Sequence, residues 1–296
     1  MNDLYENCTL CARRCGVNRS AGEVGYCKMP STPYIARAAL HMWEEPTISG
    51  TRGSGTVFFT GCSLGCIYCQ NREISRGERG KAVSTERLAE IYIELMKEGA
   101  HNINLVTPTH YVPSVIDSVA LSRERGMTLP IVYNTSSYDT VDTIRMLEST
   151  VDIYLPDLKY YKSETASRLS FAKDYREVAL AAIAEMVRQK PRPVIEDGIM
   201  KSGVVVRILL LPAHLAEAKL NLKYLYDTYG DSIYISLMSQ YTPTCEMPPP
   251  LNRAVTRAEY RELVDYAISL GVTNAFTQEH GSVGESFIPN FDGSGV

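Results

Sequence analysis

Cysteines are the residues of this chain whose spacing most directly suggests chemistry. Seven of the eight fall into two clusters, C-x2-C-x3-C-x11-C near the N-terminus and C-x3-C-x2-C farther along, and Cys245 stands alone without an assigned role. Disulfides explain the clusters poorly, because such closely spaced pairs have unfavourable geometry and a large chain kept reduced needs no covalent staples. Thiolates are soft ligands that select zinc or iron–sulfur clusters. We therefore predict two metal sites, one at Cys8, Cys11, Cys15 and Cys27 and the other at Cys62, Cys66 and Cys69.

The three-cysteine cluster has one ligand fewer than a four-iron cluster takes when it only carries electrons. An open metal position is typical of catalytic sites, whereas structural sites are closed. The cluster follows the β-rich run GTVFFTG, and Tyr68 stands directly before its last cysteine. In parallel barrels a loop that follows a strand lies at the active-site end. The spacing therefore predicts a catalytic iron–sulfur cluster with one iron left for an exogenous ligand.

The four-cysteine group lies in residues 1–50, which we expect to form an irregular, cysteine-rich, metal-binding extension. One alternative is a structural site, either a closed zinc knuckle or a rubredoxin-like iron. The other is an auxiliary iron–sulfur cluster that relays electrons or binds substrate. The uneven spacing matches neither pattern cleanly, and we favour the structural site. Residues 51–296 are expected to form the main domain with its C-terminal elements.

Beyond residue 50, short apolar runs alternate with amphipathic segments. In 85–97, Leu88, Ile91 and Leu95 recur at helical spacing, and Ser84 is placed to cap the helix. The expected strands are 56–60, 103–107, 130–135, 151–159, 204–211, 232–238 and 274–278, and the expected helices are 85–97, 112–125, 140–148, 175–189, 215–229 and 257–270. Apolar strands alternating with helices indicate a parallel sheet. Six such units predict an α/β fold, a partial (β/α)6 TIM-like barrel.

The ends of these strands are unusually polar, and the active sites of parallel barrels lie there. The polar residues in question are Thr107, Thr109, Asn134, Ser136, Asp157 and Lys159, and Arg207 interrupts an apolar strand. Asp157 and Lys159 are two apart and share one face of a strand, so a purely structural ion pair is the alternative to a functional one. Arg207 must be paired if it is buried. The pair Glu44-Glu45 is expected on a solvated face, and a role in substrate binding or cluster shielding is the alternative, because Trp43 and Pro46 flank it just before the cluster strand.

Together these motifs resemble one family. GTVFFTGCSLGCIYCQN is similar to the cluster loop of radical S-adenosylmethionine (SAM) enzymes related to pyruvate formate-lyase activating enzyme. CTLCARRCGVNRSAGEVGYCK, ALHMWEEPTISGTRGSG, NLVTPTHYVP, VDIYLPDLKYY, SLMSQYTP and FIPNF look like the PflX-like branch of that group, so the resemblance spans nearly the whole chain. It implies a partial barrel of the radical SAM type, with a [4Fe-4S] cluster on Cys62, Cys66 and Cys69 and SAM on the fourth iron.

The resemblance also implies which residues bind SAM. Tyr68 would support the adenine. Asn134 and Ser136 would contact the ribose hydroxyls. Lys159 or Arg207 would bind the methionyl carboxylate, because both carry a positive charge and hydrogen-bond donors.

Of two further sequence elements of the family, one is present in this chain and the other is missing. Its D-x-K element falls on Asp157 and Lys159. The Gly-Gly-Glu element that usually holds the SAM amino group after the second strand is absent, and Thr107-Pro108-Thr109-His110 stands there instead. Thr107 and Thr109 are therefore the candidate cofactor-binding residues at that position.

The resemblance implies an enzyme. A flavodoxin- or ferredoxin-like donor would reduce the cluster, SAM would be cleaved to methionine and a 5′-deoxyadenosyl radical, and this radical would abstract a hydrogen atom. A glycyl residue of a partner protein is the substrate that the activating-enzyme resemblance suggests; another peptide, an RNA base or a small molecule is the alternative. A non-catalytic electron carrier or zinc-stabilised binding protein is the competing class, but it would need no SAM pocket at the strand ends.

Composition limits the remaining classes. With 45% hydrophobic and 22% charged residues among 296, the chain has globular rather than disordered proportions. Thirty basic against 34 acidic residues give a net charge of -4, which disfavours nucleic acid as a partner. No apolar run approaches the roughly 18 residues of a membrane-spanning helix, and the N-terminus lacks the apolar core of a signal peptide. We expect a cytoplasmic protein without a membrane partner.

Overall fold

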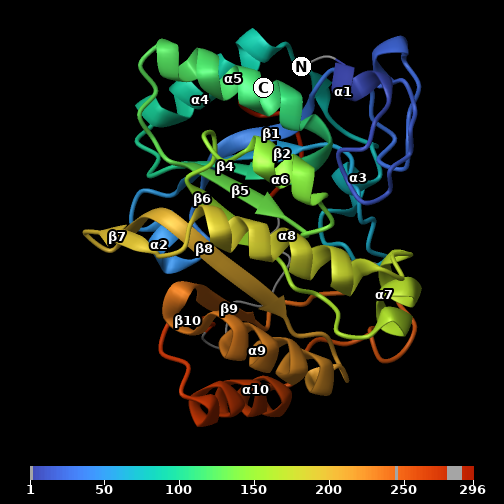
Figure 1. Cartoon of the computed structure of the whole chain (residues 1–296), viewed down its shortest axis with the longest axis vertical. Helices are drawn as coiled ribbons and strands as arrows, with labels where there is room; N and C mark the ends of the chain where they lie inside the picture. The colour runs from blue at the N-terminus through green and yellow to red at the C-terminus, as the bar shows by residue number, and fades with distance from the viewer. Residues whose placement is uncertain (1–2, 244–245, 279–288) are drawn as a thin grey trace.

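A mostly parallel sheet flanked by helices forms the body of the molecule (Figure 1). The structure is a computed structural model that describes residues 3–243, 246–278 and 289–296. Within them the sheet has the order β10-β9-β8-β6-β5-β4-β2-β1-β3, and β7 pairs with β8 at the side. Neighbours from β2 through β10 are parallel, whereas β1, β3 and β7 pair antiparallel. The predicted α/β partial barrel is confirmed.

The predicted strands and helices are present close to their expected bounds, whereas the elements at 34–41, 81–82, 163–170 and 194–196 and the four-residue helices were not predicted. The strands are β1 (Tyr34–His41), β2 (Ser54–Phe59), β3 (Lys81–Ala82), β4 (Ile103–Val106), β5 (Ile131–Thr135), β6 (Ile153–Pro156), β7 (Val194–Glu196), β8 (Ile199–Leu209), β9 (Tyr234–Met238) and β10 (Ala275–Thr277). The helices are α1 (Asp3–Glu6), α2 (Pro46–Ser49), α3 (Arg72–Ser75), α4 (Thr85–Lys97), α5 (Val112–Glu124), α6 (Val141–Met146), α7 (Ser163–Ser170), α8 (Tyr175–Gln189), α9 (Leu215–Tyr229) and α10 (Arg257–Leu270).

Local sequence explains where the longer helices begin and which side they bury. The Ser84 hydroxyl accepts the N–H of Arg87 at 3.1 Å and starts α4, as predicted. Leu88, Ile91 and Leu95 of α4 are then buried in the core. Figure 1 shows α4 and α5 packed together at one end of the molecule, α9 and α10 at the other, and α6 and α8 between them. The helices therefore cover the sheet in the order in which the strands follow one another.

Strand β1 lies inside the segment that we expected to be irregular. It pairs antiparallel with β2, and the C-terminal tail runs along it, since Ala38 N–H donates to the Ser294 carbonyl at 2.9 Å. Gly293 N–H likewise donates to the Ala36 carbonyl at 3.0 Å. The strand therefore depends on partners far away in the sequence, which is why its short apolar pattern alone did not predict it. The sheet consequently starts before residue 50.

None of the helices in the described part of the chain combines the length and the apolar character needed to cross a membrane.

Candidate active site

A cavity of about 170 Å³ opens at the carboxyl ends of the parallel strands. Of the residues predicted to bind cluster or SAM, it is lined by Cys62, Tyr68, Cys66, Cys69, Thr107, Asn134, Ser136, Asp157, Lys159 and Arg207. They come from the loop after β2 and from the ends of β4, β5, β6 and β8, so the parallel sheet brings together residues up to 145 positions apart in sequence. These polar strand-end residues and the three cysteines thus line one cavity, as the strand ends predicted.

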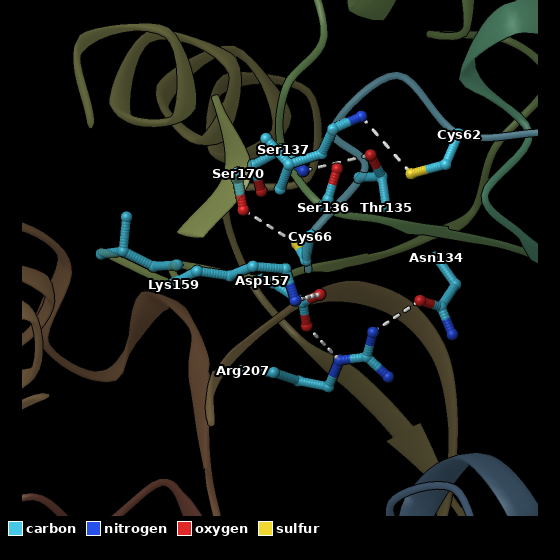
Figure 2. Close-up of polar contacts among 12 residues, drawn as sticks. Cys62, Cys66, Asn134, Thr135, Ser136, Ser137, Asp157, Lys159, Ser170 and Arg207 are labelled. Atoms are coloured by element: carbon cyan, nitrogen blue, oxygen red, sulfur yellow. Dashed lines mark hydrogen bonds and ion pairs between the residues drawn. The ribbon is translucent and has the colours of Figure 1, made fainter. Parts of the chain in front are cut away.

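The three thiols of the second cysteine cluster are free and share this cavity. The Cys62 sulfur accepts backbone N–H groups of Leu64 at 3.4 Å and of Gly65 at 3.5 Å. Ser170 Oγ at the end of α7 donates to the Cys66 sulfur at 3.0 Å (Figure 2). Such donors stabilise sulfur in its thiolate form, and burial otherwise raises the pKa of Cys62 and raises that of Cys69 to about 12.

Gly61 allows the cysteine loop to leave β2 at a sharp angle. Its φ of +88° lies in the left-handed region, and a Cβ there would stand 2.4 Å from Cγ of Met29 and 2.8 Å from the carbonyl of Cys27. A side chain at this position would therefore be strained and would collide with backbone. The loop is consequently built to pass directly beneath the N-terminal segment.

A buried network of charges lies in the same cavity as the thiols (Figure 2). The two oxygens of Asp157 bind Nζ of Lys159 at 2.7 Å and Nε of Arg207 at 2.8 Å, and Arg207 Nη2 donates to Oδ1 of Asn134 at 2.6 Å. Burial alone would raise the pKa of Asp157, but the two cations outweigh it and hold that pKa below its usual range. Burial would lower the pKa of Lys159, but Asp157 more than compensates and raises it. All three groups are therefore charged at neutral pH.

Glu45 is buried and the Glu44 side chain is only 11% exposed, next to this network, so the prediction of a solvated face is wrong. Arg207 Nη1 lies 3.4 Å from Oε2 of Glu44, whose other oxygen accepts Nδ2 of Asn104 at 3.0 Å. Burial raises the pKa of both glutamates, although Arg207 opposes that shift. The short helix α2, which follows directly, packs against β8 and carries the pair under the barrel. An unpaired arginine in an apolar strand was the sequence signal that an acidic partner had to exist.

Aromatic side chains close the cavity beside the cysteines. The Tyr160 hydroxyl donates to that of Tyr68 at 2.8 Å, and the ring of Tyr68 packs edge to face against Tyr160 and Tyr241. The cysteine motif pointed to Tyr68, but no motif pointed to Tyr160, which directly follows Lys159. Its position after the D-x-K element was the available signal.

Thr109 is not among the residues that line the cavity. Its hydroxyl lies 3.3 Å from that of Tyr133 in a buried network that also includes Thr135 and Asp139. Thr107, at a φ of +59°, is the threonine of this segment on the cavity wall. His110 is buried with Nε2 at 2.7 Å from the Thr60 carbonyl, and burial lowers its pKa to about 3. The segment after β4 thus contributes one polar residue to the wall and otherwise anchors the sheet.

A family model described as the radical SAM superfamily matches residues 56–213, more than half of the 296-residue chain. The chain belongs to the radical SAM superfamily. Members of this superfamily use a [4Fe-4S] cluster and SAM for radical chemistry, so this radical SAM protein is an enzyme.

Other known proteins extend this comparison. The radical SAM protein is 28% identical over 276 residues to uncharacterized protein MJ0674 of Methanocaldococcus jannaschii (strain ATCC 43067). The aligned region covers 90% of this chain and 75% of the relative. Among solved structures, HydG, a maturase of the [FeFe]-hydrogenase, matches with a TM-score of 0.54 and 14% identity over 78% of this chain and 53% of HydG. Methylornithine synthase (PylB) matches with a TM-score of 0.49 and 16% identity, over 75% of this chain and 70% of PylB. The chain thus spans about half the length of HydG and shares its fold.

The donor set of the cavity fits the cofactors of the superfamily. In the described ranges, no group of three or more His, Cys, Asp or Glu side chains surrounds a position for a single metal ion. A four-iron cluster keeps its thiolates farther apart than one ion does, so three free thiols that line one cavity without surrounding a single-ion position suit the cluster. The charged network in the same cavity suits the zwitterionic end of SAM. Cys245 lies outside the described residues.

Proposed function

We propose that Cys62, Cys66 and Cys69 hold the [4Fe-4S] cluster and that the charged wall of the same cavity binds SAM. The observation that carries this proposal is the placement of three free thiols and the Asp157–Lys159–Arg207 network on the walls of one cavity. When bound, the cluster and SAM supply one-electron cleavage of SAM to a 5′-deoxyadenosyl radical that abstracts hydrogen. The protein's own part is to bind, orient and shield these groups.

Each residue of the charged wall has a separable task. Asp157 is shared between Lys159 and Arg207, and Glu44 also pairs with Arg207, so Lys159 is the cation whose remaining N–H donors are available to the methionyl carboxylate. Because Arg207 occupies Oδ1 of Asn134, the Asn134 side chain offers its NH2 group, which suits an acceptor such as a ribose hydroxyl. Ser136 adds a hydroxyl to the same wall.

The remaining wall suits the nucleoside and keeps water away. The hydrogen bond from Tyr160 fixes the Tyr68 ring, which thereby offers a preorganised surface for adenine. Thr107 is the polar group available where the family's amine-binding element is missing. Thr109 does not line the cavity, but its buried hydroxyl network holds the strand ends behind the cavity wall in place.

Anaerobic turnover is the test of this assignment. Protein reconstituted with iron and sulfide, then given dithionite and SAM, is expected to release 5′-deoxyadenosine. A chain that binds no iron, or that releases no 5′-deoxyadenosine, lacks the proposed activity and would instead support a binding or electron-carrying role.

For the substrate, we infer a glycyl residue of a partner protein, with a flavodoxin- or ferredoxin-like protein as electron donor. The motifs shared with the PflX-like branch support this inference, as does the end of the cavity after β9. Gln240, Tyr241 and Thr242 line that end and are polar but uncharged, which suits a peptide backbone better than a phosphate.

The substrate prediction is tested by anaerobic co-purification from the native cell. We expect a glycyl-radical enzyme among the bound proteins, and a glycyl radical signal in its electron paramagnetic resonance (EPR) spectrum after turnover with SAM. Recovery of a different peptide, an RNA or only a small molecule as the hydrogen donor contradicts the glycyl assignment and leaves the SAM chemistry intact.

We also propose that Cys8, Cys11, Cys15 and Cys27 hold a second metal. Arg19 supports this, because its side chain is fully buried and no carboxylate pairs with it among the residues that the structure describes. It donates to the carbonyls of Met29 and Pro30 and lies 3.8 Å from the Cys8 sulfur. Thiolates bound to a metal would supply a nearby anion for this buried guanidinium, although the four thiols do not surround a single metal position in this structure. Arg19 also donates to the His110 carbonyl and lies over the rings of Tyr5 and Tyr111.

The second site is tested by metal analysis of the protein with Cys62→Ala, Cys66→Ala and Cys69→Ala combined. We expect close to one equivalent of metal to remain, because the N-terminal ligands are untouched. Zinc or iron without sulfide indicates a structural site, whereas iron with sulfide indicates an auxiliary cluster. A metal-free triple variant that still folds contradicts the proposal.

A further inference from the structure

Arg13, between the second and third cysteines of the N-terminal group, reaches the loop that carries Cys62 and Cys66. Its Nε donates to the Ser63 carbonyl at 3.0 Å and its Nη2 to the Leu64 carbonyl at 3.1 Å. Both acceptors belong to the three residues between Cys62 and Cys66, which also contain the N–H donors to the Cys62 sulfur. The guanidinium therefore holds the backbone of the cluster loop, residues 61–71.

The same guanidinium also holds the end of α7. Nη1 donates to the Phe171 carbonyl at 2.6 Å and Nη2 to the Ser170 carbonyl at 2.9 Å. Ser170 is the residue whose hydroxyl donates to the Cys66 sulfur at 3.0 Å. Arg13 thus joins the two segments that contact the thiols. Among side chains, only the planar guanidinium of arginine has enough N–H donors, five, to bind four carbonyls in this way.

The N-terminal segment fixes Arg13 in turn. The guanidinium lies 3.8 Å from the centre of the Tyr26 ring and 5.0 Å from that of Tyr138. The Tyr26 hydroxyl itself donates to the Leu64 carbonyl at 3.3 Å. Since Arg13 lies within the four-cysteine group and Tyr26 directly precedes its last member, Cys27, both contacts depend on how that group is folded.

We propose that Arg13 is a positioning residue for the cluster loop and that the N-terminal four-cysteine group sets its position. This inference rests on the proposed role of Cys62, Cys66 and Cys69 as cluster ligands. Loss of an N-terminal cysteine ligand displaces Arg13 and Tyr26, which frees the carbonyls of Ser63 and Leu64. The state of the N-terminal group therefore controls how well the cluster loop is ordered.

Backbone amide hydrogen exchange of the as-purified protein is the first test, and it needs no loaded cluster. Arg13→Gln is expected to raise exchange in residues 61–71 by about tenfold or more, because it removes charge-assisted hydrogen bonds. Arg14→Gln is the matched control, since Arg14 is exposed, and it should leave exchange unchanged. Arg13→Lys is expected to fall between the two. Equal exchange in Arg13→Gln and Arg14→Gln overturns the positioning role.

The second test is the EPR spectrum of the reduced, reconstituted protein with and without SAM. We expect Arg13→Gln to bind iron but to change the spectrum that SAM induces, and Arg14→Gln to match the wild type. If Arg13→Gln does not fold, Tyr26→Phe removes a single hydroxyl and is expected to raise exchange at Leu64 and Gly65; unchanged exchange there counts against the proposal. A wild-type protein that assembles no cluster defeats the proposed function, whereas the exchange experiment still decides the role of Arg13.

The link to the four-cysteine group is tested with Cys15→Ser, because Cys15 is the exposed member of that group. We expect faster exchange in residues 61–71 although the substitution lies outside the cluster loop. Unchanged exchange, with the N-terminal metal shown to be lost, overturns the link.

Discussion

Cys66→Ala is expected to reduce the release of 5′-deoxyadenosine to the level seen without protein. Cys66 is the middle thiol of the cluster loop, and the hydroxyls of Ser170 at the end of α7 and of Tyr160 after β6 both contact its sulfur, at 3.0 Å and 3.8 Å. With two thiolates left, the cluster loses a ligand and the iron that binds SAM loses its defined position. Product formation should be measured anaerobically with dithionite and SAM after reconstitution.

The control for this experiment is Cys245→Ala, the cysteine outside both clusters in the sequence. It should release 5′-deoxyadenosine at the wild-type rate, which separates the loss of a cluster ligand from the loss of any thiol. Equal product from Cys66→Ala and from the wild type contradicts the assignment of the three-cysteine cluster and with it the proposed mechanism.

The longer helices could be predicted because their information is local. α4, α8, α9 and α10 begin and end at the predicted residues. Each has a cap or an apolar stripe that a short window of sequence contains; in α10, for example, Thr256 and Glu259 form a capping box. The parallel strands were likewise marked by runs that are buried on both faces.

The missed elements depend on distant partners or on turn chemistry that periodicity does not report. β1 is stabilised by β2 on one side and by the C-terminal tail on the other. β7 pairs with β8 through a two-residue turn at Asp197 and Gly198, both with positive φ. An Asp-Gly pair between apolar residues is a hairpin signal that the sequence contained and that we did not use.

The parts of the site that could be predicted are those marked by cysteine spacing or by polar residues at strand ends. Sequence placed Asn134, Asp157 and Arg207 at the same edge of a parallel sheet, and they bond to one another there. It did not predict that Glu44 lies beneath Arg207 or that Arg13 holds the cluster loop, since both contacts join segments that no local pattern relates. Such tertiary contacts follow from how the N-terminal segment packs, which periodicity does not encode.

Arg207→Met is expected to lower the free energy of unfolding by about 3–5 kcal/mol, the usual cost of removing one partner from a buried ion pair. Methionine keeps much of the volume, so the loss isolates the charge. Arg207 and Asp157 have side chains that are only 12% and 15% exposed, which leaves water little chance to replace the missing cation. Asp157 then retains Lys159 alone, and Glu44 retains only Asn104. Urea unfolding of the as-purified protein under anaerobic conditions measures the change.

The same variant should unfold at a higher pH than the wild type does. Because the folded pKa of Asp157 is lowered, its stabilisation is present above the unfolded pKa of about 3.9 and is lost as the pH falls through the folded value. Without Arg207 that pKa rises, so acid unfolding starts earlier. Adding Glu44→Gln should restore part of the lost stability, because it removes a carboxylate left without its cation. A loss below about 1 kcal/mol for Arg207→Met, with no recovery in the double variant, means that the network contributes no more than an exposed ion pair.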